Sequence, residues 1–138
     1  GKGTHLGQSL WLREIAGREA GNAPTVDLEA ELHNGELVRQ LIDDGSVTAV
    51  HDVSDGGLLV ALAEMAMAGK RGCQLSVTLD TAGAFGEDQG RYIVTAPAGT
   101  AIPGAEKIGT VGGSEVAGVS VSALREASES FFRDWMEA

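Results

Sequence analysis

The spacing of apolar residues predicts two helices in the first third of the chain. Ser9 is placed to cap a short helix that ends before Gly17, and Asp27 to cap a longer helix that ends at Gly45. The Asn34-Gly35 pair interrupts the helical spacing of the second segment, and this pair is typical of a turn. We therefore expect the longer helix to be broken or weak at that point.

From Val47 onward the pattern changes to short β-branched or alternating runs between helical stretches. It predicts strands at 47–53, 73–79, 92–95, 107–112 and 115–121, with helices at 58–68 and 123–136. This order nearly matches a split βαβ, or ferredoxin-like, arrangement, so we expect an α/β (α+β) fold with a mixed sheet flanked by helices. Prolines and glycines between residues 96 and 106 predict a short loop in place of the second crossover helix. The amphipathic stripe of the last helix, which carries Phe131 and Trp135, predicts packing in a core or an interface.

Composition and charge exclude several classes of protein. The chain has 138 residues, 43% of them hydrophobic, and a formal charge of −10, which suits one compact domain and argues against nucleic acid as a partner. The longest apolar stretch, residues 58–68, is too short to span a bilayer. A single cysteine, Cys73, excludes an internal disulfide, so a reducing, cytoplasmic location is expected. Because the first residue is Gly1 in a glycine-rich stretch, we expect a piece of a longer protein.

The first candidate site is the run HDVSDGGL at residues 51–58, where a strand passes through two glycines into a helix. Backbone amides at a helix N-terminus bind anions, and glycines allow a ligand to approach closely. Two carboxylates in the run are weak candidates for Mg²⁺, and the histidine for proton transfer or a substrate contact. The spacing alone favours the alternative, a capped turn with a hydrogen-bonded sheet histidine. The candidate phosphate, nucleotide or substrate loop is His51, Asp52, Ser54, Asp55, Gly56 and Gly57, with Asp52 and Asp55 as the possible metal ligands.

The second candidate is the polar loop that precedes the predicted strand 92–95. Its side chains Glu87, Asp88, Gln89 and Arg91 combine carboxylates, an amide and a guanidinium. An arginine binds phosphate or carboxylate through two hydrogen bonds, and Glu87 and Gln89 are suited to a hydroxyl or amidine-like group. The alternative is a solvated turn in which Glu87 and Arg91 form a weak surface pair.

These motifs together resemble a known family. The segments LGQSLWLREIAG, HDVSDGGL, FGEDQGRY and KIGTVGG occur in the order found in the phosphoribosylformylglycinamidine synthase family, in the last domain of its large synthetase subunit. The resemblance implies the C-terminal domain of the aminoimidazole ribonucleotide synthetase-like fold, as the second of two copies. Residues 1–138 would form a single C-terminal domain fragment, with 1–20 as a lead-in segment and short helix and 25–138 as the α/β body.

The resemblance also implies a function. The family's full-length enzyme is an ATP- and Mg²⁺-dependent ligase that converts formylglycinamide ribonucleotide to the amidine with ammonia from glutamine, in purine biosynthesis. Its partners are the other synthetase domains, a glutaminase subunit and a small accessory subunit. In the family's first half, a Glu-Ser-Gln run touches substrate; Glu87, Asp88 and Gln89 match it here, with aspartate in place of serine. The second-half site holds a structural nucleotide or nothing.

We therefore expect the isolated chain to be inactive, to contain no catalytic residue of its own and to require no cofactor. Two alternatives stay open. In the first, the chain is a non-catalytic scaffold or binding module. In the second, it is the C-terminal domain of another superfamily enzyme such as selenophosphate synthetase.

Overall fold

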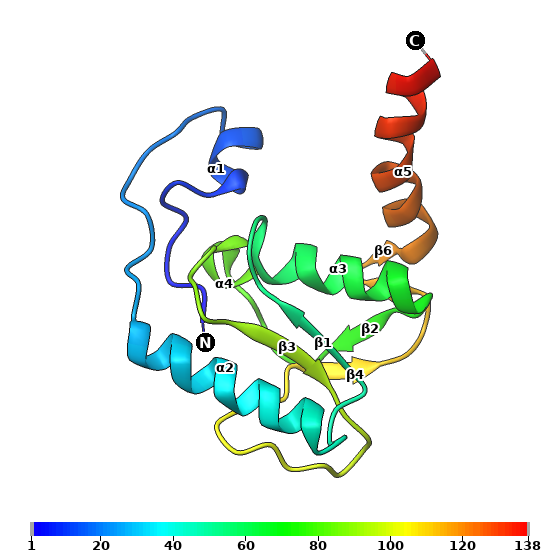
Figure 1. The fold of residues 1–138 in the computed structure, drawn as a ribbon. Helices are drawn as coiled ribbons and strands as arrows, with labels where there is room; N and C mark the ends of the chain where they lie inside the picture. The colour runs from blue at the N-terminus through cyan, green and yellow to red at the C-terminus, as the bar shows by residue number, and fades with distance from the viewer. Residues whose placement is uncertain (1, 138) are drawn as a thin grey trace. The chain divides into compact units, whose positions relative to one another are not determined.

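The computed structural model describes residues 2–137, whose helices and strands are labelled in Figure 1. These residues divide into two compact units. Unit 1 comprises the residues up to Ala61 together with Leu79–Glu106, and unit 2 comprises Leu62–Thr78 together with the residues from Lys107 onward. The boundary passes through helix α3 (Gly57–Gly69), so each unit contains one half of this helix.

The helices of unit 1 begin at side-chain caps. Ser9 accepts a hydrogen bond from the Leu12 amide at the start of α1 (Leu10–Glu14), and Asp27 accepts from the first amides of α2 (Leu28–Asp43). Both caps confirm the sequence-based expectation, because a short polar side chain there satisfies amides that have no partner within the helix. Gly45, at a φ of 64°, follows the end of α2 as predicted.

The prediction of a break at Asn34-Gly35 is wrong, because α2 runs through both residues without interruption. The contacts that α2 makes at these two residues explain why the helix continues through them. Asn34 Nδ2 donates to the Gly90 carbonyl at 2.9 Å, and a β-carbon at Gly35 would lie 3.7 Å from the Tyr92 hydroxyl. Tertiary contacts therefore outweigh the weak helix propensity of the pair.

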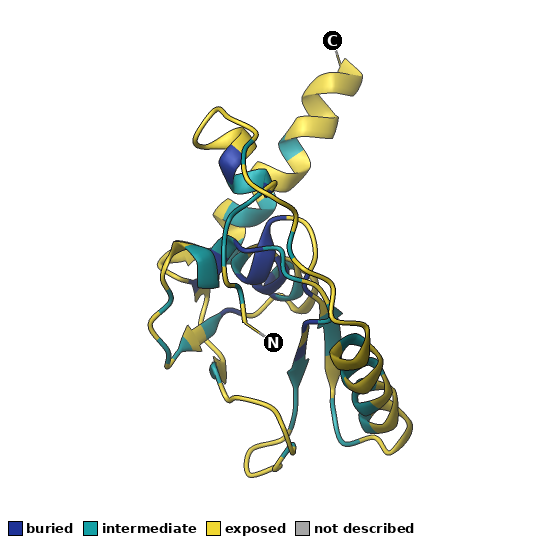
Figure 2. Ribbon diagram, turned by 90° about the vertical axis from the view of Figure 1, so that its left-hand side faces the viewer, coloured by how far each residue is buried: buried dark blue, intermediate teal, exposed yellow. Residues whose placement is uncertain are grey.

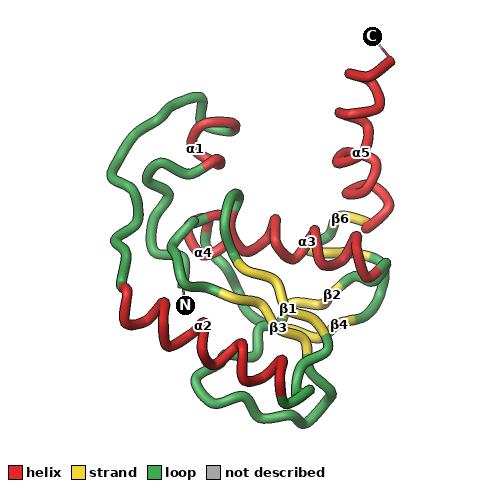
Figure 3. The backbone as a smooth tube through the Cα atoms, viewed as in Figure 1, coloured by secondary structure: helices red, strands yellow, loops and turns green. Residues whose placement is uncertain are grey.

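Unit 1 contains a two-stranded antiparallel ladder. Strand β1 (Ala49–Asp52) pairs with β3 (Tyr92–Thr95), and His51 lies opposite Ile93. The short helix α4 (Thr81–Phe85) precedes β3 and begins at Asp80, whose side chain accepts from the Gly83 amide at 2.7 Å. The sequence pattern did not indicate this helix. Residues 96–106, after β3, form the predicted loop without a helix (Figure 3).

Unit 2 contains a four-stranded mixed sheet in the order β4-β2-β5-β6. Its elements are β2 (Cys73–Leu75), β4 (Gly109–Val111), β5 (Glu115–Val116), β6 (Val119–Ser120) and helix α5 (Val121–Glu137). The β2–β5 pair is parallel and the other pairs are antiparallel. The expected α/β class with mixed sheet pairing is confirmed, although the strands form two separate ladders, and β2 is shorter than the predicted strand 73–79.

Small and aliphatic side chains form the core of each unit (Figure 2). The buried apolar residues of unit 1 are Leu12, Val53, Leu58, Ala61, Ala84 and Ile93, and those of unit 2 are Leu62, Ala66 and Val116. The half of α3 in each unit contributes to this core, which agrees with the apolar character of the helix on nearly all sides.

The turn between β5 and β6 is a strained two-residue hairpin. Val116 pairs with Val119, so only Ala117 and Gly118 form the loop, and both have left-handed backbones, with φ of 48° and 82°. This conformation defines the type I′ turn, in which Asn-Gly is the preferred sequence. Alanine at the first position is unfavourable because its β-carbon approaches the following carbonyl oxygen.

Replacing Ala117 by asparagine should therefore stabilise unit 2, by about 0.5–1 kcal/mol, since asparagine tolerates the left-handed region better. The matched variant Gly118→Ala should be destabilising by a similar amount, because the space around Gly118 is open and only its backbone conformation opposes a side chain. Urea denaturation followed by circular dichroism measures both. Equal midpoints for the two variants would contradict this account of the turn.

Candidate functional site

The two candidate loops lie against each other in unit 1, joined through one carboxylate. Glu87 Oε1 accepts a hydrogen bond from the Gly56 amide at 2.8 Å and another from the Leu10 amide at 2.8 Å. The polar loop therefore connects the β1–α3 corner with the first residue of α1, although 77 residues separate Leu10 from Glu87. Charge-assisted hydrogen bonds of this kind are stronger than neutral ones.

The two glycines of the corner are needed for this close packing. Gly57 has a φ of 74°, and a β-carbon there would lie 2.7 Å from the Phe85 backbone. Gly56 has a φ of 81°, and a β-carbon there would lie 2.6 Å from a Val60 methyl group. Both positions therefore require glycine for backbone conformation and for space.

Both glycine amides have acceptors within the chain. The Gly56 amide donates to Glu87, and the Gly57 amide donates to the Ser54 carbonyl at 3.0 Å. Both residues are buried. The open corner that we expected for an external anion is therefore occupied by the protein's own carboxylate and backbone, and these two amides do not fit a nucleotide phosphate in this structure.

The other residues of the first loop are more accessible. Asp52, Ser54 and Asp55 are exposed, and His51 is half-buried. His51 Nδ1 lies 2.5 Å from the Asp52 carbonyl oxygen, which can only accept, so Nδ1 carries the proton. Within residues 2–137, no group of three or more histidine, cysteine or acidic side chains is arranged to hold a metal ion. The described chain thus offers Mg²⁺ no ready set of ligands, and the roles predicted for Asp52 and Asp55 stay predictions.

The second loop is folded inward instead of being a solvated turn. Arg91 is 5% exposed, and its Nη1 donates to the Gly86 carbonyl at 2.9 Å. Its Nε has no hydrogen-bond partner among the described residues. Burial lowers the pKa of Arg91, and the charge of Asp88 opposes this change. The expected surface pair of Glu87 with Arg91 is therefore replaced by separate contacts of each side chain with backbone, while Gln89 is exposed.

Asp88 attaches the N-terminal segment to the same loop. The Thr4 amide donates to one carboxylate oxygen at 2.9 Å, and the Thr4 hydroxyl donates to the other at 2.5 Å. Partial burial acts to raise the pKa of Asp88, but the Thr4 hydrogen bonds and the charges of His5 and Arg91 outweigh it, so the pKa lies below its usual value. Aspartate at this position therefore has a structural role in holding the segment around Thr4.

Ring packing supports the same junction between α1 and the polar loop. The ring centroids of Trp11 and Phe85 are 6.5 Å apart at an interplanar angle of 30°. Trp11 follows Leu10, whose amide binds Glu87, and Phe85 precedes the loop. Sequence reasoning did not identify Thr4, Leu10 or Trp11 as part of this arrangement, because no local pattern indicates contacts over such separations.

Replacing Glu87 by alanine should destabilise unit 1 by about 1–3 kcal/mol, because the Leu10 and Gly56 amides both lose their acceptor in a partly buried place. The control Glu87→Gln keeps a side-chain oxygen and loses only the charge, so its loss of stability should be smaller. Urea denaturation measures the difference, and hydrogen exchange at the two amides locates it. An alanine variant as stable as the parent would contradict the bridging role.

Stability should also fall in acid through Asp88. Because the folded-state pKa is lower than the unfolded value of 3.8, the carboxylate stabilises the fold fully above that value. This contribution is lost as the pH falls below 3.8 through the folded-state pKa. The free energy of unfolding should thus decline more steeply below about pH 4 for the parent than for Asp88→Asn.

The control for this comparison is Asp44→Asn, which removes an exposed carboxylate at the end of α2. Urea titrations between pH 3 and 6 supply the unfolding free energies. Parallel pH profiles of the parent and the Asp88→Asn variant would show that the Thr4 contacts do not stabilise the charged form.

Comparison with known proteins identifies the family of the chain. The model of the family described as AIR synthase related protein, C-terminal domain, matches residues 2–122. The phosphoribosylformylglycinamidine synthase subunit PurL of Novosphingobium aromaticivorans is 66% identical over 137 residues, which are 99% of this chain and 19% of that protein. The subunits of the same name from Erythrobacter litoralis and Granulibacter bethesdensis are 50% and 51% identical over 97% and 94% of this chain, and 20% of each protein.

The chain thus spans about a fifth of the length of the curated relatives that it matches. In the part of the chain that the structure describes, no helix is long and apolar enough to cross a membrane. The family model covers both candidate loops and every strand of the two units. The chain therefore belongs to the family of the AIR synthase related protein, C-terminal domain.

Proposed function

We propose that this chain acts as the C-terminal domain of a phosphoribosylformylglycinamidine synthase, the ATP-dependent ligase that forms an amidine in purine biosynthesis. The observation that carries the proposal is the 66% identity over 99% of the chain to a subunit of that name. Such identity over nearly the whole of this chain supports the synthase over other superfamily members.

The isolated chain should not turn over substrate. Catalysis needs several groups that converge on the reacting atoms. In the described residues, the Gly56 and Gly57 amides are already bonded within the chain, and no metal-binding cluster is formed. ATP and Mg²⁺ would therefore be held mainly by other parts of the full-length enzyme.

The first loop remains the best candidate for contact with a nucleotide, phosphate or substrate in the full-length enzyme. Its side chains His51, Asp52, Ser54 and Asp55 are exposed or half-buried, and Glu87 accepts a hydrogen bond from the Gly56 amide of the same loop. A ligand there would contact the exposed side chains. We assign Gly56 and Gly57 a structural role, and Glu87, Asp88 and Arg91 the role of fixing the loop.

The proposal includes the partners and the location that the resemblance implies. These are the remaining synthetase domains, a glutaminase subunit that supplies ammonia, and a small accessory subunit, all in the cytoplasm. The acidic balance of −10 disfavours nucleic acid as a further partner.

A second candidate is a domain that only supports the architecture of the enzyme. The occupation of both glycine amides by Glu87 and by backbone favours it, because the corner then needs no ligand to satisfy its donors. Titration of ATP and ADP into the full-length enzyme, with and without the Ser54→Ala and Asp55→Ala changes, separates the two candidates: affinity that falls in these variants supports a ligand loop.

A chimera tests the main proposal. The C-terminal region of the N. aromaticivorans subunit is replaced by this chain, and amidine formation from formylglycinamide ribonucleotide, ATP, Mg²⁺ and ammonia is measured. We expect a rate within roughly tenfold of the parent, which corresponds to about 1.4 kcal/mol in the activation barrier. The control is the subunit truncated before this region, which should be inactive.

A folded chimera without amidine formation would overturn the proposed activity. Steady release of ADP by the isolated chain under the same conditions would contradict its expected dependence on the other domains.

A further inference from the structure

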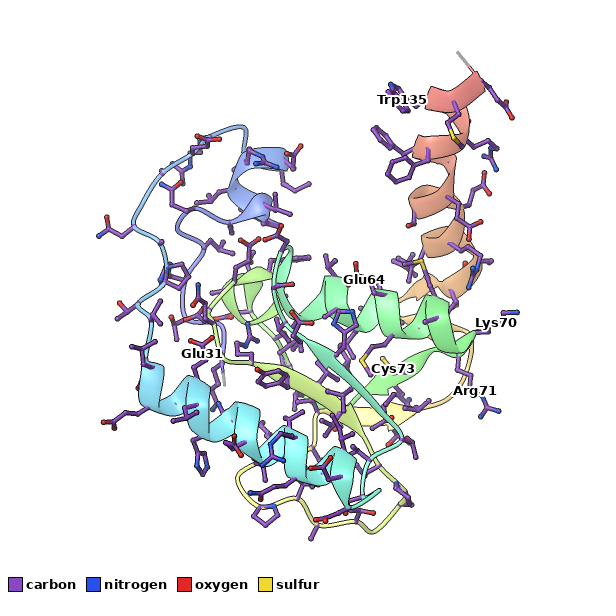
Figure 4. The ribbon with its side chains drawn as sticks, viewed as in Figure 1. Glu31, Glu64, Lys70, Arg71, Cys73 and Trp135 are labelled. Carbon is purple, nitrogen blue, oxygen red and sulfur yellow. The ribbon has the colours of Figure 1, made fainter. Side chains whose placement is uncertain are left out.

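The outer half of α5, residues 129–137, carries a large apolar face that no other described element covers. The exposed fractions of Phe131, Phe132, Trp135 and Met136 are 66%, 61%, 73% and 74%. Figure 4 shows Trp135 near the outer end of the helix, and Figure 2 shows this half as exposed. Contiguous apolar side chains of this size on a surface indicate an interaction site.

The spacing of the apolar side chains is that of a helix-packing seam. Val121, Leu124, Ala127, Phe131 and Trp135 follow one another at intervals of three and four residues. This alternation places them on one face, as in helices that pack into a groove or against another helix. Only the first part of the seam is half-buried, at Val121 and Leu124, whereas the part with the largest side chains is exposed.

The base of α5 is fixed to unit 2, so the exposed face has a defined position on that unit. The Val121 amide donates to the Ser114 carbonyl at 2.8 Å, and Arg125 Nη2 donates to the Met67 carbonyl at the end of α3. Ser120 Oγ accepts from the Ala123 amide at 3.1 Å. A helix held at its base and apolar at its outer end presents its aromatic side chains as a rigid surface.

Ion pairs link the charged side chains of the same helix. Arg125 pairs with Glu129 at 2.9 Å, and Arg133 pairs with Glu126 at 2.7 Å. These exposed pairs contribute little energy. By helical spacing, Glu126 and Arg133 lie on the side of the helix away from Phe131 and Trp135. Phe131 and Phe132 pack edge to face at a centroid distance of 5.2 Å.

The comparisons indicate what kind of partner this surface fits. The family model ends at residue 122, so nearly all of α5 lies outside the fold that the family shares. The long relative that is 66% identical matches 99% of the chain, so the match includes nearly all residues of α5, while four-fifths of that relative lies beyond the matched region. The residues of this helix are therefore matched in a much longer polypeptide.

We propose that the outer half of α5 docks into an apolar groove on another domain of the same full-length polypeptide. The proposal rests on the proposed function, which places the chain within a polypeptide about five times as long. A second copy of this chain is a weaker partner, because each copy carries a charge of −10 and like charges repel. Tryptophan at the centre of a buried contact is the residue type that contributes most to such interfaces.

The test uses the full-length chimera described above, with Cys73→Ser as the background. One variant carries Trp135→Cys on the apolar face, and the matched control carries Arg133→Cys on the side of the same helix where Arg133 pairs with Glu126. Maleimide labelling at position 135 should be at least about tenfold slower than at position 133, because the docked face is reached only through local opening. Equal labelling rates would overturn the proposal.

Two further measurements keep the result decisive. If the Trp135→Cys variant does not fold, hydrogen exchange of the amides from 128 to 136 is measured in the unsubstituted chimera instead of labelling. Exchange as fast as in an exposed helix would overturn the proposal. Slow labelling that disappears on dilution would indicate a second copy and also overturn it, whereas protection independent of concentration supports it. Amidine formation by the same chimera is recorded separately, so an active chimera with an exposed α5 refutes the docking alone.

Discussion

The two hydrogen bonds accepted by the Glu87 carboxylate determine the arrangement of unit 1. They join the start of α1, the corner between β1 and α3, and the loop before β3, three segments that are distant in the sequence. Around this carboxylate the backbones are in direct contact, since a β-carbon at Gly57 would lie 2.7 Å from the Phe85 backbone. The position of each segment therefore depends on one acidic side chain and on a glycine that leaves room for it.

This arrangement gives the glycine-rich corner a structural role instead of the expected anion-binding role. A strand that passes through glycines into a helix exposes amides that attract anions. Here the anion is part of the protein, because Glu87 binds the Gly56 amide and Asp88 beside it binds Thr4. An external phosphate at that amide must displace a tethered carboxylate that is already in place. The motif thus serves first to assemble the unit, and a ligand is left with the exposed side chains of the loop.

Local features were predictable from the sequence, and long-range features were not. The caps Ser9 and Asp27 and strand β3 were predicted correctly because each depends on residues within a few positions. The uninterrupted α2 was not, since the packing of Asn34 and Gly35 against the segment 90–92 overrides their preference for a turn. The residue types of the second loop were recognised as polar and acidic, but their inward direction follows from contacts with Thr4 and Leu10 across more than 70 residues.

The last helix illustrates the same limit in another way. Its amphipathic pattern correctly indicated a helix with one apolar face, and such a face is normally buried against another element. An amphipathic pattern does not indicate whether the surface that packs against the apolar face belongs to the same unit, to another domain or to another molecule. In unit 2 the sheet ends at β6 with two-residue strands, and this small platform reaches only the first turns of α5. A helix of 17 residues is much longer than these two-residue strands. The aromatic half of α5 therefore has no packing partner among the described residues.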